Sequence, residues 1–332
     1  MRERRRRALP AALILAVGCS GCGERDAADS NPAAEAAPGV PALQSGSGQF
    51  TFHDARGNAD RPITVRYHMP DGYTPETPIV FVMHGASRTG QRYFDDWEEH
   101  AIAHGFLLVV PEFDADNYPG SQWYNLGNVF PDPDAETTPN ADRPADAGAD
   151  QAAAGSATRN PESAWSFAAI EHLFDAVRAA TGSTRTTFRI FGHSAGSQFV
   201  HRLLMTRPDA PVERAVAANA GWYTMPDESV AWPYGLGDSG FDAAGLAGFL
   251  QLPVTVLLGD ADTVTTAGNL RRTPEAMLQG PHRFTRGHTF YAAAQSAAEA
   301  LGVDFGWALD TVPGAGHSNA LMAPRAAEIL AR

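Results

Sequence analysis

Apolar residues recur along the chain in short runs that are typical of strands separated by helices. Residues 50–52 and 63–68 alternate apolar and polar side chains, which predicts strands with one buried face. Residues 78–83 and 106–110 are continuous apolar runs, as in central strands covered on both faces. From about residue 49 onward, the pattern therefore predicts a buried sheet.

Helical periodicity lies between these runs. Phe94, Trp97, Ala101 and Ile102 fall on one stripe and predict a helix over residues 93–104. The same reasoning predicts further helices at residues 160–180, 197–206 and 289–301 and one ending near 330, and further strands at 187–191, 215–220, 254–258 and 305–312. Because strands alternate with helices, we expect an α/β fold, with a mostly parallel central sheet flanked by helices.

The length of 332 residues suits one large domain, which we place at residues 49–332, with a small lid from residues 221–251 or none. One long irregular stretch interrupts the pattern, from about residue 111 to 159. Its first half carries Trp123 and Tyr124 and is expected to line the site. Its second half, at about 131–159, is rich in Asp, Pro, Ala and Gly and reads as a mobile surface insertion. Calcium binding by these Asp residues is an alternative, although no ordered ligand spacing is present.

The N-terminus has the organisation of a secretory signal. Five Arg lie within the first seven residues, followed by a short apolar run to Gly18. Residues 15–19 resemble a bacterial lipobox, which predicts cleavage after residue 18 and lipidation of Cys19, with Cys22 as a competitor. A buried N-terminal helix is the alternative. The run is shorter than the roughly 20 residues that span a bilayer.

Residues 19–48 contain almost no large apolar side chains and are expected to form a flexible tether. Together these features predict an extracytoplasmic bacterial lipoprotein, in which the lipid on Cys19 is the only contact with the membrane.

Charge and composition remove several classes of function. The formal net charge is −13, and all 25 basic residues are Arg. A nucleic-acid partner is not expected without a basic footprint, and mechanisms that need a Lys are excluded. Only Cys19 and Cys22 are available as thiols, so the folded body has no disulfide framework and no thiolate zinc site. We expect no metal and no cofactor.

The clearest candidate chemistry is Gly192-His193-Ser194-Ala195-Gly196, which follows a predicted strand and precedes a predicted helix. This is the setting of a nucleophile elbow, in which Ser194 is held above the sheet by a tight turn. An ordinary strand-to-helix turn is the alternative. A serine hydroxyl also needs a base that accepts its proton.

His317 is the candidate base, because it alone among the histidines follows a predicted strand at a glycine-rich turn, residues 314–316. A carboxylate should orient the imidazole from another strand end. Asp260 and Asp262 both qualify, and we favour Asp262 because it lies one step past the turn. The tetrahedral intermediate needs two N–H donors, for which Ala195 and Ala86 are the candidates, with Ser87 as an extra donor.

The order Ser194, Asp262, His317 is that of the α/β-hydrolase superfamily, which the chain resembles from residue 49 onward. More narrowly, it resembles the polyhydroxybutyrate depolymerase and feruloyl esterase-like group of secreted serine esterases. The motifs that carry this resemblance lie at residues 82–85, 192–196, 219–223, 259–263 and 313–317. In that group an aromatic residue near the position of Trp222 lines the acyl pocket. The resemblance therefore implies that Trp222 contacts substrate, with Trp123 and Tyr124 as weaker candidates; a core role for Trp222 is the alternative.

These observations predict a carboxylic ester hydrolase that forms an acyl-enzyme. The acyl group, and whether the ester is polymeric or small, stay open. A serine peptidase or amidase on the same fold is one alternative. A non-catalytic, lipid-tethered binding protein is another, although such a protein would have no need of all three triad residues.

Overall fold

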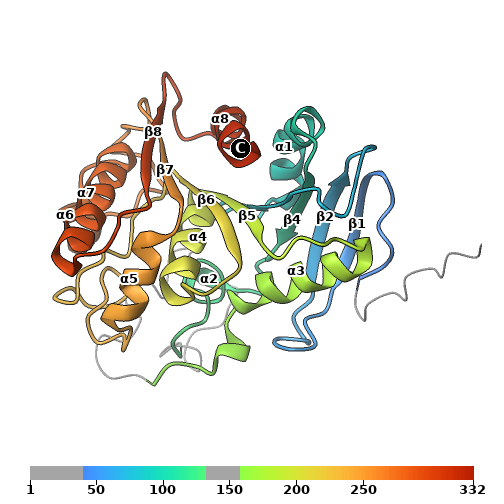
Figure 1. Ribbon diagram of the computed structural model, residues 1–332. Helices are drawn as coiled ribbons and strands as arrows, with labels where there is room; N and C mark the ends of the chain where they lie inside the picture. The colour runs from blue at the N-terminus through green and yellow to red at the C-terminus, as the bar shows by residue number, and fades with distance from the viewer. Residues whose placement is uncertain (1–39, 132–157) are drawn as a thin grey trace, which may run out of the picture. The chain divides into compact units, whose positions relative to one another are not determined.

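Eight strands form one sheet within the residues that the structure describes. The computed structural model describes residues 40–131 and 158–332. The strands are β1 (Gly46–Phe52), β2 (Ile63–Met69), β3 (Ile79–Met83), β4 (Leu107–Glu112), β5 (Phe188–His193), β6 (Val212–Ala218), β7 (Val254–Gly259) and β8 (Ala308–Val312). Their order across the sheet is β1-β2-β4-β3-β5-β6-β7-β8 (Figure 1). Strand β2 is antiparallel to β1 and to β4, and every other neighbouring pair is parallel.

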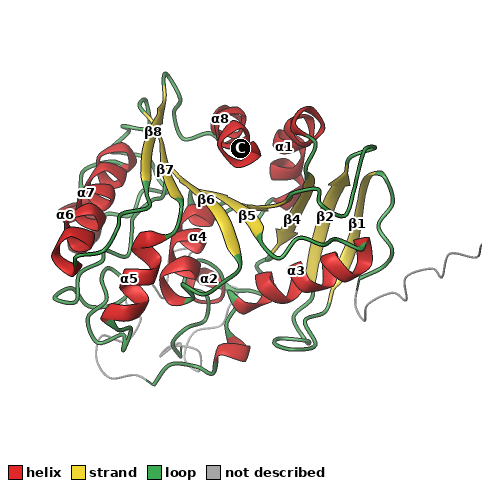
Figure 2. Ribbon diagram, in the orientation of Figure 1, coloured by secondary structure: helices red, strands yellow, loops and turns green. Residues whose placement is uncertain are grey.

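Helices cover both faces of this sheet, so the predicted α/β fold is confirmed (Figure 2). Helices α1 (Gly90–His104) and α8 (Asn319–Ala331) pack together on one face. Helices α3 (Ala168–Thr181), α4 (Ala195–Thr206) and α7 (Arg283–Leu301) contribute to the core on the other. The shorter helices are α2 (Gly120–Trp123), α5 (Ala243–Gln251), α6 (Pro274–Gln279) and the 3-10 turn η2 (Glu162–Ala164).

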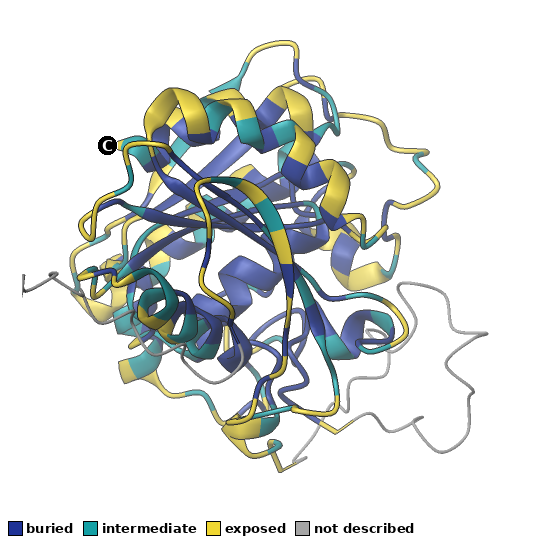
Figure 3. Ribbon diagram, turned by 90° about the vertical axis from the view of Figure 1, so that its right-hand side faces the viewer, coloured by how far each residue is buried: buried dark blue, intermediate teal, exposed yellow. Residues whose placement is uncertain are grey.

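The continuous apolar run of β3 is explained by this layering. Val80 and Val82 belong to the core beneath α1 and α8, whereas Ile79, Phe81 and Met83 belong to the core on the opposite face. Successive side chains of a strand point to opposite faces, so a strand buried on both sides must be apolar throughout. Figure 3 shows the sheet buried between helices whose outer surfaces are exposed.

The folded body begins earlier than the sequence pattern predicted. Val40 and Leu43 are buried, and β1 starts at Gly46, so residues 40–48 are not a flexible tether. Residues 46–52 of β1 pair with β2 although only Phe50 and Phe52 among them are large and apolar. A Cβ on Gly48 would overlap the ring of Tyr67, so the small residues make room for β2 side chains rather than marking a linker.

Two helical predictions also need correction. The helix predicted at 160–180 is divided into η2 and α3, separated by an extended Trp165. The helix predicted from residue 289 starts at Arg283, because the side chain of His282 caps its N-terminus by accepting a hydrogen bond from the Thr285 amide.

The stretch at 221–251, considered as a small lid, ends in α5, which packs against α4 and α7. The predicted signal, Cys19 and residues 132–157 of the predicted insertion lie outside the described residues. In the described ranges, no helix is both long and apolar enough to cross a membrane.

Candidate active site

The candidate catalytic residues lie at the carboxyl edge of the sheet. Ser194 follows β5, Asp262 follows β7 and His317 follows β8. Because β5, β6, β7 and β8 are parallel neighbours, their carboxyl ends meet at one edge, where ligands bind in open α/β sheets.

Ser194 occupies the strained turn that a nucleophile elbow requires. Its backbone has φ 60° and ψ −118°, and it is the N-cap residue of α4. A Cβ on Gly192 would overlap the carbonyl of Gly196, and a Cβ on Gly196 would overlap the carbonyl of Met83. Both glycines are therefore required for the close approach of α4 to β3 and β5.

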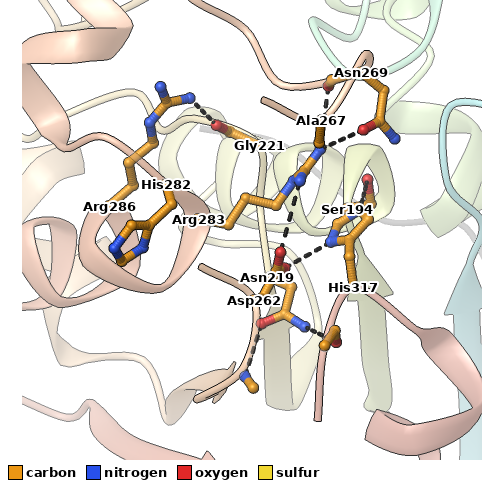
Figure 4. Close-up of polar contacts among 12 residues, drawn as sticks. Ser194, Asn219, Gly221, Asp262, Ala267, Asn269, His282, Arg283, Arg286 and His317 are labelled. Atoms are coloured by element: carbon orange, nitrogen blue, oxygen red, sulfur yellow. Dashed lines mark hydrogen bonds and ion pairs between the residues drawn. The ribbon is translucent and has the colours of Figure 1, made fainter. Parts of the chain in front are cut away.

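The three predicted residues form one chain of hydrogen bonds (Figure 4). Ser194 Oγ lies 3.0 Å from His317 Nε2, and His317 Nδ1 lies 2.7 Å from Asp262 Oδ2. A neutral imidazole that donates from Nδ1 to the carboxylate has Nε2 free to accept the serine proton. This is the geometry that a Ser-His-Asp triad needs.

The structure separates the two candidate carboxylates. Asp260 Oδ1 accepts a hydrogen bond from the amide of Gly314 at 2.6 Å, so its side chain fixes the turn that leads to His317. Asp262 is 2% exposed and contacts the imidazole itself. Asp262 therefore makes the contact that the third residue of a triad needs, whereas Asp260 holds the neighbouring turn.

Sequence reasoning missed Arg283, the first residue of α7. Its side chain is buried, and its Nη1 lies 3.6 Å from Asp262 Oδ1. Nη2 donates to the backbone carbonyl of Asn269 at 3.1 Å and to its Oδ1 at 2.9 Å. Burial lowers the pKa of Arg283, and the charge of Asp262 opposes that shift. No periodicity or motif marks this arginine, because its partners lie 14 and 21 positions away in the chain.

Asn219, at the end of β6, is a second supporting residue. It is fully buried, and its Oδ1 accepts from the amide of Gly259 at 2.9 Å. Its Nδ2 donates to the carbonyl of Gly316 at 3.5 Å. The side chain therefore links the loop that carries Asp262 to the loop that carries His317. In the sequence, residues 219–223 stand out only as one of the motifs that carry the family resemblance, and no role for Asn219 is predicted.

The loop after β3 is held rigidly beside Ser194. His84 Nε2 accepts from the amide of Phe113 at 3.0 Å, which makes Nδ1 the donor toward the carbonyl of Gly85, also at 3.0 Å. Burial, followed by the charge of Arg88, lowers the pKa of His84 to about 3, so the ring is neutral. Tyr124 Oη donates to the carbonyl of His84 at 2.6 Å.

Arg88 fixes the other end of this loop. Its guanidinium donates to the carbonyls of Phe113 and Gly120 at 2.6 and 2.7 Å. Ala86, between these two anchors, and Ala195 both line the hollow that Ser194 faces. This is where the donors of an oxyanion hole are needed, and a loop anchored at both ends is preorganised for that task.

Two hollows flank Ser194, and Ala86, Ser194 and Asn269 line both. The first has a volume of about 250 Å³. It is lined further by Ser121, Asn125, Ala195, Gln198, Gly221, Trp222, Gly268, Arg271 and Arg283. The second lies on the side of His317 and is lined further by Gly85, Ser87, Thr89, Arg92, Tyr93, His193, His317, Ser318 and Asn319.

The predicted substrate-contact residues divide between these places. Trp222 lines the first hollow and Ser87 the second. Trp123 lines neither and packs beneath the guanidinium of Arg61, 3.9 Å from its ring centre. Tyr124 is fully buried, so the prediction that it contacts substrate is wrong; it supports the loop at His84 because its hydroxyl finds a partner there.

Solved structures of known hydrolases are similar to this chain. A poly(aspartic acid) hydrolase from Sphingomonas sp. KT-1 is 42% identical with a TM-score of 0.78, over 87% of this chain and 100% of the other. LpqC, a poly(3-hydroxybutyrate) depolymerase from Bordetella parapertussis, is 37% identical with a TM-score of 0.75, over 86% and 89%. An S-formylglutathione hydrolase from Agrobacterium tumefaciens, 17% identical with a TM-score of 0.50 over 86% and 95%, shares the fold.

No protein-family model and no curated protein matches the chain. The identity and coverage of the first two structures are nevertheless high enough to establish kinship, and the sheet order and flanking helices agree with it. The chain belongs to the α/β-hydrolase superfamily and is a hydrolase, related to the poly(aspartic acid) hydrolase and poly(3-hydroxybutyrate) depolymerase that it resembles.

Proposed function

We propose that the protein is a serine hydrolase that cleaves carboxylic esters through an acyl-enzyme, with Ser194, His317 and Asp262 as its catalytic triad. The observation that carries this proposal is the chain of 3.0 and 2.7 Å contacts from Ser194 through His317 to Asp262. The similarity to a poly(3-hydroxybutyrate) depolymerase, whose name implies a polyester substrate, supports ester chemistry.

Acylation begins when His317 Nε2 accepts the hydroxyl proton of Ser194 and Oγ attacks the ester carbonyl carbon. The carbonyl oxygen becomes an oxyanion, which the N–H groups of Ala86 and Ala195 stabilise. His317 then gives its proton to the leaving alkoxide, the C–O bond breaks, and the acyl group remains on Ser194.

Deacylation repeats these steps with water. His317 accepts a proton from the attacking water, and the second tetrahedral intermediate collapses to release the acid while Oγ regains its proton. Asp262 stays ionised throughout and stabilises the imidazolium that forms in each half-reaction.

The position of His317 supports a proposal for which part of the ester occupies each hollow. The leaving alcohol must lie beside the imidazole that protonates it, so it belongs in the second hollow, which His317 lines. The acyl group then occupies the first hollow, where Trp222 supplies an aromatic wall. An aromatic wall favours flat or chain-like acyl groups through its contact area.

The test compares the rate of ester hydrolysis, measured with an activated aryl ester, with the rate of amide hydrolysis, measured with the matched p-nitroanilide. We expect ester hydrolysis that is lost in Ser194→Ala by about 10⁴-fold and lost after treatment with a serine-directed phosphonate. A phosphonate adduct on Ser194, located by peptide mapping, identifies the nucleophile. Full activity of Ser194→Ala, or an absence of hydrolysis across an ester panel of graded acyl length, would refute the proposal.

A second candidate is the hydrolysis of amide bonds in an anionic polymer. Arg271 and Arg283 line the first hollow and Arg92 the second, and none of the described residues that line either is Asp or Glu. In a chain with a net charge of −13, arginines on both sides of Ser194 favour a substrate that carries carboxylates. The similarity to a poly(aspartic acid) hydrolase points the same way.

Polymer degradation separates the candidates. Chain-length analysis of poly(aspartic acid) and of poly(3-hydroxybutyrate), each incubated with the protein, should show shortening of one and not of the other. If poly(aspartic acid) is shortened, and if salt and Arg92→Gln both slow this shortening, amide hydrolysis of an anionic polymer is favoured over ester hydrolysis.

For location, we propose the extracytoplasmic face of a bacterial membrane, with a lipid on Cys19 as the anchor. The support is the signal-like N-terminal pattern of the sequence. Cys19→Ala should release the protein from the membrane fraction or block its maturation. Fully processed, membrane-bound mutant protein would move the anchor to another residue, such as Cys22.

A further inference from the structure

The two carboxylate oxygens of Asp262 face different partners. Oδ2 accepts from His317 Nδ1 at 2.7 Å, while Oδ1 lies 3.6 Å from Arg283 Nη1. The side chains of Asp262 and Arg283 are each 2% exposed. An ionised carboxylate at such a depth requires compensation by charge or hydrogen bonds, which a single neutral imidazole supplies only in part.

Arg283 is itself fixed in place rather than free to turn away. The main-chain carbonyl and the side-chain oxygen of Asn269 both accept from its Nη2. The next residue, Phe284, donates its amide to the carbonyl of Asp262 at 3.2 Å. The first turn of α7 therefore holds Asp262 by its main chain and its side chain together. The positive end of the helix dipole adds to the same field.

We propose that Arg283 is a positioning residue of the catalytic site, which compensates the buried charge of Asp262 and holds its Oδ2 against His317. The inference rests on the proposed function, since it assigns a role within that triad. Arg283 acts through Asp262, although it also lines the hollow beside Ser194.

A pH profile can detect this role, because the charges around the pair are known. His317 is faced by Asp262, by the ring of His193 from β5, and by Arg92 and Tyr93 of α1, which line the same hollow. Asp262 is faced in addition by Arg283 of α7 and by Tyr223, whose pKa burial raises and Asp262 raises further.

Removal of the guanidinium makes protonation of either member of the Asp262–His317 pair easier. The active form of the pair requires the carboxylate to be ionised and the imidazole to be neutral. The variant therefore loses this form at a higher pH than the parent does. The acid limb of the kcat/KM profile should move upward, by roughly half a pH unit or more for the loss of one nearby charge.

The experiment measures kcat/KM against pH for Arg283→Met, Arg283→Gln and Arg283→Lys with an activated ester. We expect the Met and Gln variants to lose about tenfold or more at neutral pH and to shift the acid limb upward. Arg283→Lys, which restores a cation, should leave the limb near its original position. Where the Met variant does not fold, the Gln variant carries the test.

Arg286→Met is the matched control on the same helix. Arg286 is buried and donates to the carbonyls of Gly280, Gly221 and Arg271, but no contact joins it to the triad. Its loss should lower thermal stability without moving the acid limb. A double-mutant cycle completes the design, because Arg283→Met should cost little in an Asp262→Asn background if it acts through that carboxylate.

An unmoved acid limb in folded Arg283→Met and Arg283→Gln, with losses that are additive to those of Asp262→Asn, would overturn the inference. Ser194→Ala keeps this failure separate from failure of the proposed function. If Ser194→Ala is inactive and the limb does not move, only the role of Arg283 is lost. If Ser194→Ala is active, both the proposed catalytic triad and the positioning role of Arg283 are refuted.

Discussion

The ring of His193 lies directly against the ring of His317, with centroids 4.7 Å apart and planes inclined by 36°. His193 Nδ1 is 3.1 Å from Tyr93 Oη, and burial, followed by the charges of His317 and Arg283, holds its pKa well below 6.5. The site thus contains two neighbouring imidazoles, of which only that of His317 contacts both Ser194 and Asp262.

The two histidines should respond differently to substitution. His317→Gln should lower kcat/KM by about 10³-fold or more, because the serine proton loses its acceptor. His193→Gln should cost far less, since its neutral ring supplies packing and one hydrogen bond. Steady-state kinetics on one ester, with folding checked by circular dichroism, decides the matter; an equal loss in both would mean that His193 takes part in proton transfer.

The two carboxylates after β7 give a second contrast. Asp262→Asn should reduce kcat severely, because an amide cannot stabilise the imidazolium as a carboxylate does. Asp260→Asn keeps an oxygen that can accept from the Gly314 amide, so a small effect is expected. The reverse order of the two losses would make Asp260 the triad residue.

The parts of this site that the sequence predicted are those encoded locally. The glycines around Ser194 and the apolar run of β3 are short patterns with direct steric or burial causes. Arg283, Asn219 and Arg88 could not be placed in the same way, because each acts through partners from distant parts of the chain. Only the fold brings these partners together.

The same distinction explains the errors. Residues 46–48 belong to the predicted tether because they carry no large apolar side chain, yet pairing with β2 makes them part of a strand. The prediction that Tyr124 contacts substrate rests on its place in the irregular stretch after residue 111 and on the family resemblance. The structure buries it under His84 instead, and a sequence pattern alone does not tell these two environments apart.

Asn219 allows a test of whether the loops that carry Asp262 and His317 depend on the hydrogen bonds of this side chain. Asn219→Ala leaves the buried amide of Gly259 without its acceptor, which costs about 1–3 kcal/mol of unfolding free energy. Because the loops of Asp262 and His317 both lose a tether, kcat should fall while KM changes little. Asn58→Ala, which removes one hydrogen bond to Ala164 far along the chain, is the control for stability alone. Unchanged kcat in a destabilised Asn219→Ala would limit Asn219 to folding.

Buried histidines should make the folded state sensitive to acid. Burial, followed by the charge of Arg202, holds the pKa of His201 well below 6.5, and that of His84 is about 3. In the unfolded chain both rings bind a proton near pH 6.5, so the unfolded state takes up more protons as the pH falls. Stability should therefore be full above pH 6.5 and should decrease below it, for His84 down to about pH 3, by about 1.4 kcal/mol per histidine per pH unit.

Urea unfolding at pH 7.5 and 5.5 measures this dependence. His201→Gln should reduce the change in unfolding free energy between the two pH values by about the contribution of one histidine. His104→Gln, at an exposed position, should leave this change as it is in the parent. A free energy of unfolding that does not change between the two pH values would show that these rings are not held neutral in the folded protein.

Trp222 provides the most direct probe of the acyl group. Its ring lines the first hollow and contacts the guanidiniums of Arg202 and Arg271, which lie 4.1 and 5.3 Å from its centre. Cation–π contacts on such a ring hold its orientation, so it forms a fixed wall beside Ser194 rather than a mobile gate. Trp222→Ala should raise KM for an aromatic acyl ester roughly 5- to 30-fold, the equivalent of about 1–2 kcal/mol of lost contact, and should change KM for an acetyl ester far less.

Trp222→Phe keeps part of the wall and should lie between the parent and the alanine variant. Trp97→Phe serves as the control, because Trp97 lies on the buried face of α1 and lines neither hollow. It should affect both esters alike through stability. If Trp222→Ala also raises KM equally for the two substrates, the ring is a structural element, and the preference for aromatic or chain-like acyl groups must come from elsewhere in the hollow.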